Sequence, residues 1–121
     1  MKAILRSGFL ALAIMALAVP ANAGPWEEIV AANERGDYAN ALILLRPLAE
    51  QGDADAGVIL GLMHDQGQGV PQNYAEAVKW YRMAAKQDHT LAQTALGLRY
   101  DQGQGVPLNH AEAVKLWRNA A

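Results

Sequence analysis

One segment of the sequence is written twice at a fixed spacing of 36 residues. The string Asp-Gln-Gly-Gln-Gly-Val-Pro occupies residues 65–71 and recurs unchanged at residues 101–107. The surrounding blocks, 53–85 and 89–121, match as well. Self-similarity with a period of about 20–50 residues is typical of stacked repeat arrays. Because such an array offers an elongated surface, the repeat indicates a protein that works by contacting a partner.

The same spacing continues toward the N-terminus. Residues 37–39, Asp-Tyr-Ala, precede the Asn-Tyr-Ala of residues 73–75 by 36 positions. Upstream of Asp37 the match fails, as expected of a terminal repeat that faces solvent on one side. We therefore expect three units: a degenerate helix pair at residues 24–52 and full repeats at residues 53–88 and 89–121.

Residues 1–23 have the features of an export signal. Lys2 and Arg6 precede an apolar run at residues 9–19, and Ala21 and Ala23 supply a small-x-small cleavage pattern. The run is shorter than the roughly 20 residues that a spanning helix needs. We expect cleavage after Ala23, a periplasmic or secreted mature chain, and membrane contact only through the transient signal. An uncleaved anchor is the alternative.

Composition excludes several classes of protein. The chain has no cysteine, so neither disulfides nor a lipid-modified cysteine can form. Without Lys2 and Arg6, 8 basic residues of the 10 remain against 12 acidic ones, and no basic stripe is present. Nucleic acid is therefore not an expected partner.

Each full unit has the pattern of two helices. In the second helix, apolar residues from Tyr74 to Ala85 follow helical spacing, with charged residues on the other side. Asn73 is a good N-cap, and Glu76 stands three residues on, where its carboxylate can complete a capping box. Asn109 and Glu112 repeat this arrangement.

The first helix of the unit is expected at residues 54–66. It is apolar nearly all round, which predicts neighbours on several sides. Gly61 and Gly97 stand in mid-helix, where glycine costs about 1 kcal/mol relative to alanine. We expect another helix backbone to approach closely there. Gly67 and Gly103 are predicted to end the helix in the left-handed conformation, and Gly69 and Gly105 continue the loop. No stretch alternates as a strand should, so the expected fold is all-α.

These motifs resemble the Sel1-like repeat family, a branch of the tetratricopeptide-like α-solenoids. The resemblance rests on residues that recur in both full units: Ala56, Leu60-Gly61, Gly67-x-Gly69-Val70, Ala77, Trp80 and Ala84-Ala85, then Ala92, Leu96-Gly97, Tyr100, Gly103-x-Gly105-Val106, Ala113, Trp117 and Ala120-Ala121. The segment 47–52 looks like that of exported bacterial members. The resemblance implies a right-handed superhelix of antiparallel helix pairs, about six helices after the signal, and an adaptor or scaffold role.

Catalytic chemistry is not expected. The carboxylate pairs of Asp65 with Glu76 and of Asp101 with Glu112 recur in each repeat, which favours architecture over acid–base catalysis. The histidines are too scattered for a metal set, and His64 is interpreted as a packing substitute for the tyrosine usual in the family. We therefore expect no enzyme and no cofactor. The alternative is a β-lactam-like small-molecule binder or hydrolase, by resemblance to cysteine-rich relatives, whose cysteines this chain lacks.

Another protein or peptide is the expected partner. By analogy with other helix-pair arrays, the first helix of each unit is expected to line the concave side. The candidate contact residues there are Asp55, Val58, Leu62, Asp65, Leu91, Thr94, Leu98 and Asp101. The alternative is that Val58 and Leu62 only complete packing between units. Among the aromatic residues, Trp80 is the one expected on the surface, because Tyr81 already occupies the inward stripe.

The last unit ends before a closing Gln-Gly like that of residues 51–52. We therefore expect Val114, Leu116 and Trp117 to lack a covering helix on one side. Soluble arrays normally end in a polar cap. The expectation is that further residues or a second subunit cover this face.

Overall fold

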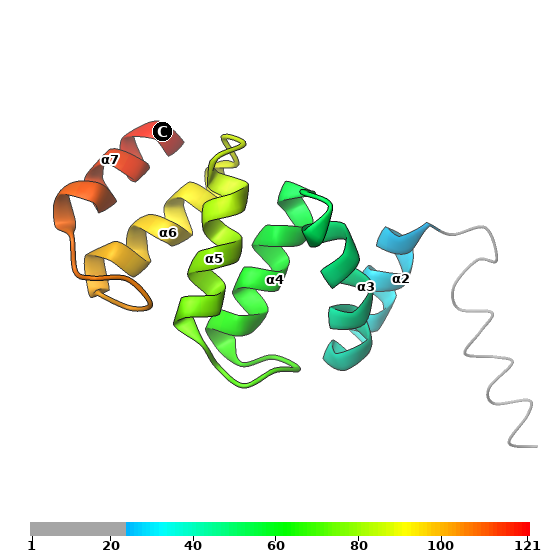
Figure 1. The fold of residues 1–121 in the computed structure, drawn as a ribbon. Coiled ribbons are helices and arrows are strands. Elements are labelled where there is room, and N and C mark those ends of the chain that lie inside the picture. Colours follow the sequence, from blue (N-terminus) through cyan, green and yellow to red (C-terminus); the bar gives the residue numbers. More distant parts are fainter. Residues whose placement is uncertain (1–23) are drawn as a thin grey trace, which may run out of the picture.

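The computed structural model describes residues 24–121, and within them the chain forms six helices and no strand. The helices follow one another along an elongated array (Figure 1). Their bounds are α2 Pro25–Glu34, α3 Tyr38–Glu50, α4 Ala54–Gln66, α5 Tyr74–Ala85, α6 Thr90–Gln102 and α7 His110–Ala120. The predicted export signal lies outside the described residues.

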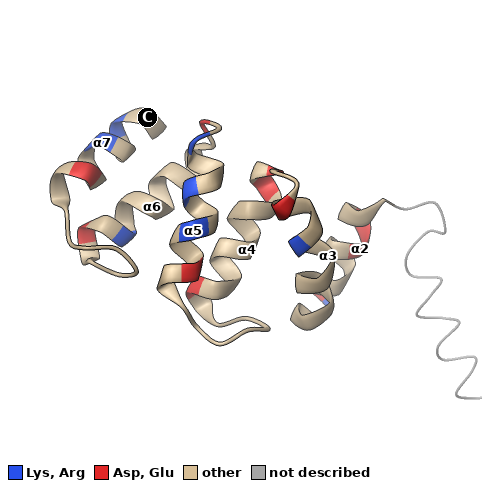
Figure 2. Ribbon diagram, in the orientation of Figure 1, with Lys and Arg blue, Asp and Glu red and all other residues tan. Residues whose placement is uncertain are grey.

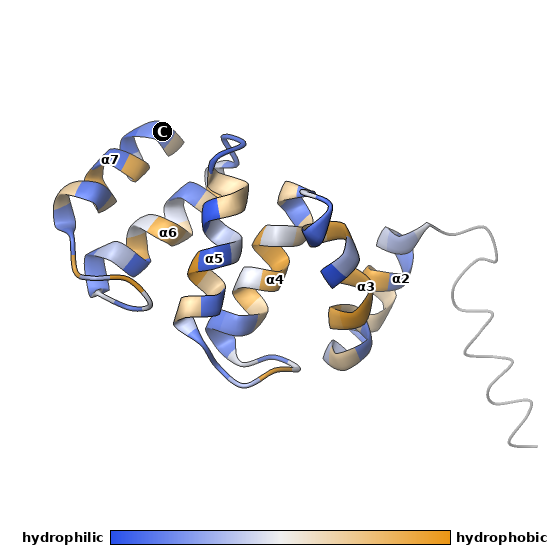
Figure 3. Ribbon diagram, in the orientation of Figure 1, coloured by the Kyte–Doolittle hydropathy of each residue, from blue (hydrophilic) through white to orange (hydrophobic). Residues whose placement is uncertain are grey.

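Each helix packs mainly on its neighbours in the chain, so the fold is a stack of hairpins α2–α3, α4–α5 and α6–α7. The predicted all-α solenoid of antiparallel helix pairs is confirmed. Hydrophobic residues are densest on α3 and α4, in the middle of the stack (Figure 3). Basic and acidic residues are mixed along the array and do not gather on one face (Figure 2).

The second helices begin at the predicted caps, although only half of each capping box forms. The side chain of Asn73 accepts a hydrogen bond from the N–H of Glu76 at 3.1 Å, and Asn109 accepts from Glu112 at 3.0 Å. The N–H of Asn73 already donates to the carbonyl of His64 at 2.8 Å. Because that donor is satisfied by the preceding helix, the Glu76 carboxylate does not need to reach back, and it lies 3.7 Å from Lys79 instead.

The glycines of the repeated loop have two separate roles. Gly67 and Gly103 end α4 and α6 with φ of +69° and +65°, as predicted. Gly69 and Gly105 lie against the start of the second helix in the preceding unit. A Cβ at Gly105 would stand 2.5 Å from the carbonyl oxygen of Tyr74. This close approach holds successive hairpins at one spacing.

The mid-helix glycines make room for aromatic rings, and the expected helix backbone does not lie there. A Cβ at Gly61 would lie 2.6 Å from the ring of Tyr81, and one at Gly97 would overlap the indole of Trp117. Tyr81 and Trp117 are 36 residues apart, so both hairpins use the same ring-on-glycine contact. That contact brings the two helices of each hairpin together.

The prediction that Trp80 lies on the surface is wrong. Trp80 is 6% exposed and packs with Leu60 and Met63, in the core cluster that spans α2 to α5. Leu116, its counterpart in the next unit, is 9% exposed. The helix α5 buries two adjacent aromatic residues because α4 covers one side of it and α6 another.

Candidate protein-binding groove

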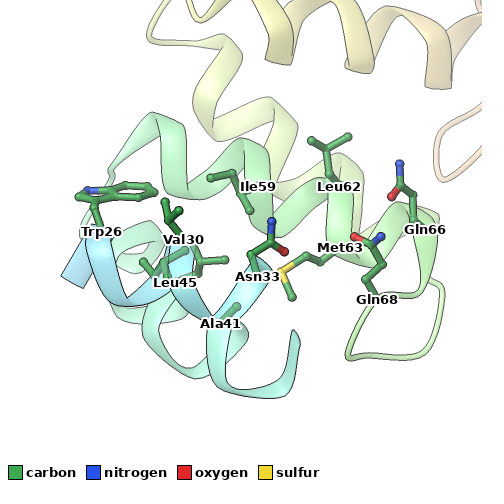
Figure 4. A pocket seen from close by; sticks show the side chains of 11 residues that line it. Trp26, Val30, Asn33, Ala41, Leu45, Ile59, Leu62, Met63, Gln66 and Gln68 are labelled. Carbon is green, nitrogen blue, oxygen red and sulfur yellow. The ribbon is translucent and has the colours of Figure 1, made fainter. Parts of the chain in front are cut away.

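An apolar groove of about 270 Å³ lies between α2 and α4, with α3 at its base (Figure 4). Ala41 and Leu45 of α3 are almost fully buried and form the floor. The complete lining comprises Trp26, Ile29, Val30, Asn33, Ala41, Leu45, Ile59, Leu62, Met63, Gln66 and Gln68.

Helical periodicity explains how α2 and α4 both face the groove. Pro25 starts α2, and Trp26, Val30 and Asn33 then fall on one side at i, i+4 and i+7. The buried Ile29 and Ala32 fix the rotation of α2 against α3. On α4, Ile59, Leu62 or Met63, and Gln66 have equivalent spacing. The groove walls are therefore two parallel side-chain rows.

The chemistry of the groove suits an uncharged guest. None of its lining residues carries a charge. Val30 is 53% exposed, so part of the apolar wall meets solvent. The carboxamides of Asn33, Gln66 and Gln68 both donate and accept hydrogen bonds, as a peptide backbone requires. The arrangement can hold an apolar side chain while bonding the backbone that carries it.

Of the eight contact residues predicted from sequence, Leu62 lines this groove. Val58 is 2% exposed and packs with Ala84 and Ala92, which fits the alternative that it completes packing between units. Leu91 and Leu98 are exposed on α6, 50% and 40% respectively, away from the groove. Because α4 is apolar nearly all round, its sequence does not show which side faces a ligand.

The three predicted aspartates form bonds within the chain. Asp55 lies 2.8 Å from Nε2 of His89, and Asp101 lies 2.6 Å from Nδ1 of His110. Thr94 donates from its hydroxyl to the Thr90 carbonyl.

Asp65 belongs to a polar network that joins three helices. It accepts a hydrogen bond from the hydroxyl of Tyr81 at 2.9 Å and from Nη1 of Arg99, also at 2.9 Å. The Arg99 guanidinium also stacks over the ring of Tyr74 at 4.9 Å. Burial, with the Asp65 carboxylate second, raises the pKa of Tyr81 far above its ordinary value. Asp65 is therefore engaged in joining repeats and is not paired with Glu76 for proton transfer.

Sequence reasoning missed Arg99, which is only 7% exposed. Its counterpart one repeat earlier is Met63, so the repeat pattern itself predicts an apolar residue there. The one available signal was the charge at an otherwise apolar position of α6.

His64 is buried, 7% exposed, and neither of its ring nitrogens has a hydrogen-bond partner among the described residues. Its counterpart Tyr100 accepts a hydrogen bond from Nη2 of Arg82 at 2.9 Å. Burial lowers the pKa of His64 below 6.5; Glu76 raises it, while Arg46 and Lys79 lower it further. The side chain fits the predicted packing role as a neutral imidazole.

A second hollow, of about 290 Å³, lies between α5, α6 and α7. It is more polar, and side chains of both charges line it, among them Arg82, Lys86, Asp88 and Glu112. Across residues 24–121, no group of three or more His, Cys, Asp or Glu side chains is arranged to hold a metal ion. Within the same range, no helix combines the length and hydrophobicity needed to cross a bilayer.

The fold and its glycine-rich loops match the family model described as Sel1 repeat, in three segments, residues 34–53, 55–89 and 90–121. The protein belongs to the Sel1 repeat family. Sel1 repeat proteins generally mediate protein–protein interactions, and the repeat is typically a non-catalytic scaffold. A comparison with curated proteins found no match.

Two crystal structures resemble this Sel1 repeat chain. A Sel1 repeat protein from Oxalobacter formigenes matches with a TM-score of 0.72 and 34% identity, over 77% of this chain and 38% of that one. The protein c5321, a protective antigen present in uropathogenic Escherichia coli strains and displaying an SLR fold, matches with a TM-score of 0.66 and 39% identity. That match covers 76% of this chain and 22% of c5321. The chain thus spans well under half the length of either protein.

Proposed function

We propose that this Sel1 repeat protein is a non-catalytic scaffold that binds a segment of another protein in the groove between α2 and α4. The carrying observation is the groove itself, apolar at its base and walls, uncharged throughout and open to solvent beside Val30. An apolar pocket with a few convergent polar groups is the usual form of a specific binding site.

The chemistry of the groove also describes the segment it would take. An aliphatic or aromatic side chain would enter between Trp26 and Leu62, because burial of apolar area supplies most of the binding free energy. The carboxamides of Asn33, Gln66 and Gln68 would bond the backbone on either side. A charged residue would be rejected, since none of the lining residues could pair with it.

We further propose that the scaffold acts in the periplasm or outside the cell, after cleavage following Ala23. The support is the charged start, the apolar run and the Ala-x-Ala pattern of residues 1–23. The helix α2 begins at Pro25, so a cut at this position would leave the whole groove in the mature chain.

A photoreactive amino acid at position 30 tests the groove in living cells, with position 43 as the matched control. Ile43 is 68% exposed on α3 and does not line the groove. We expect a specific adduct from position 30 alone. The captured protein, once purified, should then bind Val30→Glu at least about 10-fold more weakly than the parent, while Ile43→Glu binds normally. Equal capture at both positions would argue against the groove, and β-lactam turnover abolished by one groove substitution would contradict a non-catalytic role.

Fractionation tests the location independently. Mass spectrometry of the protein from the periplasm or medium should give a chain that begins at Gly24. An Ala23→Arg variant should accumulate as a longer, membrane-associated precursor, because the signal peptidase needs a small residue at that position. A full-length chain found only in the cytoplasm would refute export while leaving the groove proposal intact.

A further inference from the structure

The outer face of α7, at the end of the array (Figure 1), repeats a face that is covered elsewhere in the same molecule. On α5, Val78 is 3% exposed and Tyr81 is fully buried, and both belong to a cluster with Leu96 of α6. Their counterparts on α7, Val114 and Trp117, are 40% and 37% exposed. The same residue pattern is thus buried on α5 by the following helix and exposed on α7.

The interface between repeats shows what a covering helix supplies. Leu96 contributes the apolar contact of α6 with α5. Three residues on, Arg99 donates to Asp65 at 2.9 Å, and the hydroxyl of Tyr100 accepts from Arg82 at 2.9 Å. The interface therefore uses one leucine, one arginine and one tyrosine in the order Leu-x-x-Arg-Tyr.

The acceptor groups for that pattern recur at the exposed face. Asp101 is the counterpart of Asp65, and its side chain is 38% exposed against 17% for Asp65. His110 contacts one carboxylate oxygen of Asp101, and Asp65 uses both of its oxygens. Arg118 is the exposed counterpart of Arg82. The face thus retains an apolar centre flanked by a carboxylate and a guanidinium.

We propose that the face formed by Val114, Trp117, Asp101 and Arg118 binds an amphipathic helix of another polypeptide that carries the pattern Leu-x-x-Arg-Tyr. The leucine covers Val114 and Trp117, the arginine pairs with Asp101, and the tyrosine hydroxyl accepts from Arg118. The proposal does not depend on the groove between α2 and α4, because that site lies at the opposite end of the array.

A second copy of this chain fits the face less well. The helix available for head-to-tail stacking is α2, which exposes Glu27 and Glu34 on the side away from α3. Those carboxylates would meet Asp101 and an apolar surface, and like charges at close range are unfavourable. The complementary charge at this position is a cation, as Arg99 shows one repeat earlier.

A synthetic peptide with the sequence of residues 89–104 contains the pattern and serves as the probe. Calorimetric titration of the purified protein should give saturable 1:1 binding. Val114→Glu should weaken binding at least about 30-fold, because it buries an unpaired charge, while Val30→Glu, in the other site, should leave it unchanged. Circular dichroism and the melting temperature establish that both variants fold.

The arginine contact is tested by a cycle that mainly changes the probe. The peptide with Arg99→Met should bind about 10-fold more weakly to the parent protein and suffer no further loss against Asp101→Asn. Absence of saturable binding, or equal binding by Val114→Glu, would overturn the proposal. So would sedimentation equilibrium showing that the chain self-associates through a contact that Val114→Glu abolishes, because the occupant would then be a second copy.

Discussion

At the scale of single residues, small side chains decide how close the helices come. Gly61 and Gly97 are costly in a helix considered alone. Each lies under an aromatic ring from the second helix of its hairpin, and Tyr81 is completely buried over Gly61. The loss in helix propensity is thus offset by packing that a methyl group would prevent.

Gly61→Ala should lower the free energy of unfolding by about 1–3 kcal/mol, because the buried ring of Tyr81 has no room to move. Gly57→Ala is the matched control on the same helix. There a new Cβ would meet the flexible end of Met83, which can turn away. Gly57→Ala should leave stability unchanged or raise it by up to about 1 kcal/mol. Urea denaturation measures both, and equal effects would contradict the ring-packing account.

His64 should make stability depend on pH. Burial lowers its folded-state pKa below 6.5, so the unfolded chain takes up the proton more readily. The stabilising contribution of neutral His64 is therefore present above about pH 6.5 and decreases as the pH falls through that value toward the folded-state pKa.

In His64→Phe, the drop in the free energy of unfolding between about pH 7.5 and about pH 5.5 should be smaller than in the parent. His89 and His110 remain in both proteins and act as internal controls. Chemical denaturation at the two pH values measures the difference. An identical drop in both proteins would show that His64 does not titrate unfavourably in the fold.

At the scale of helices, two devices set the position of each hairpin on the next. The second loop glycine contacts the start of the preceding second helix, as Gly105 does at Tyr74. The Asp65–Arg99 pair joins first helices of successive repeats, with side-chain exposures of 17% and 8%. Charged pairs this well buried are costly to break on one side only.

A double-mutant cycle on Asp65→Asn and Arg99→Met measures the strength of that connection. Each single change should destabilise the protein, because it leaves the partner buried without its counter-charge. The coupling free energy from urea denaturation should be about 1–3 kcal/mol. Arg99→Met reproduces the residue found at the equivalent position 63, so it adds little steric change. Coupling near zero would indicate that the two side chains stabilise the fold independently.

At the scale of the whole molecule, contacts run mainly between chain neighbours, so stability should be local along the array. The α2–α3 end carries the proposed groove, and the α6–α7 end carries the proposed helix-binding face. The two sites share no residue, and a scaffold of this form can hold two partners at a fixed separation.

Hydrogen exchange followed by mass spectrometry should reveal this locality. Leu116→Ala, at a core position of α7, should raise exchange mainly in α6 and α7. Leu45→Ala, at a fully buried position of α3, should raise it mainly in α2 and α3. A uniform rise along residues 24–121 in both variants would mean that the array unfolds as one cooperative unit.

The repeat, the caps and the left-handed glycines were readable from sequence because they depend on neighbours within a few residues or on an identical copy 36 residues away. Asn73, Asn109, Gly67 and Gly103 act as predicted. The glycines at 61 and 97 were correctly identified as contact points, although the contacting group is a ring. The groove was mostly missed: Leu62 lines it, while Trp26, Val30 and Asn33 come from the unit whose repeat pattern is weakest.

Periodicity alone therefore determined that this chain is a stack of helix hairpins and where those helices begin and end. Tertiary structure decided which side of α4 faces the groove, that Trp80 points inward, and that Arg99 meets Asp65 across 34 residues. The physical reason is that a helix apolar on all sides has no preferred face of its own, so its orientation is set by the helices packed around it.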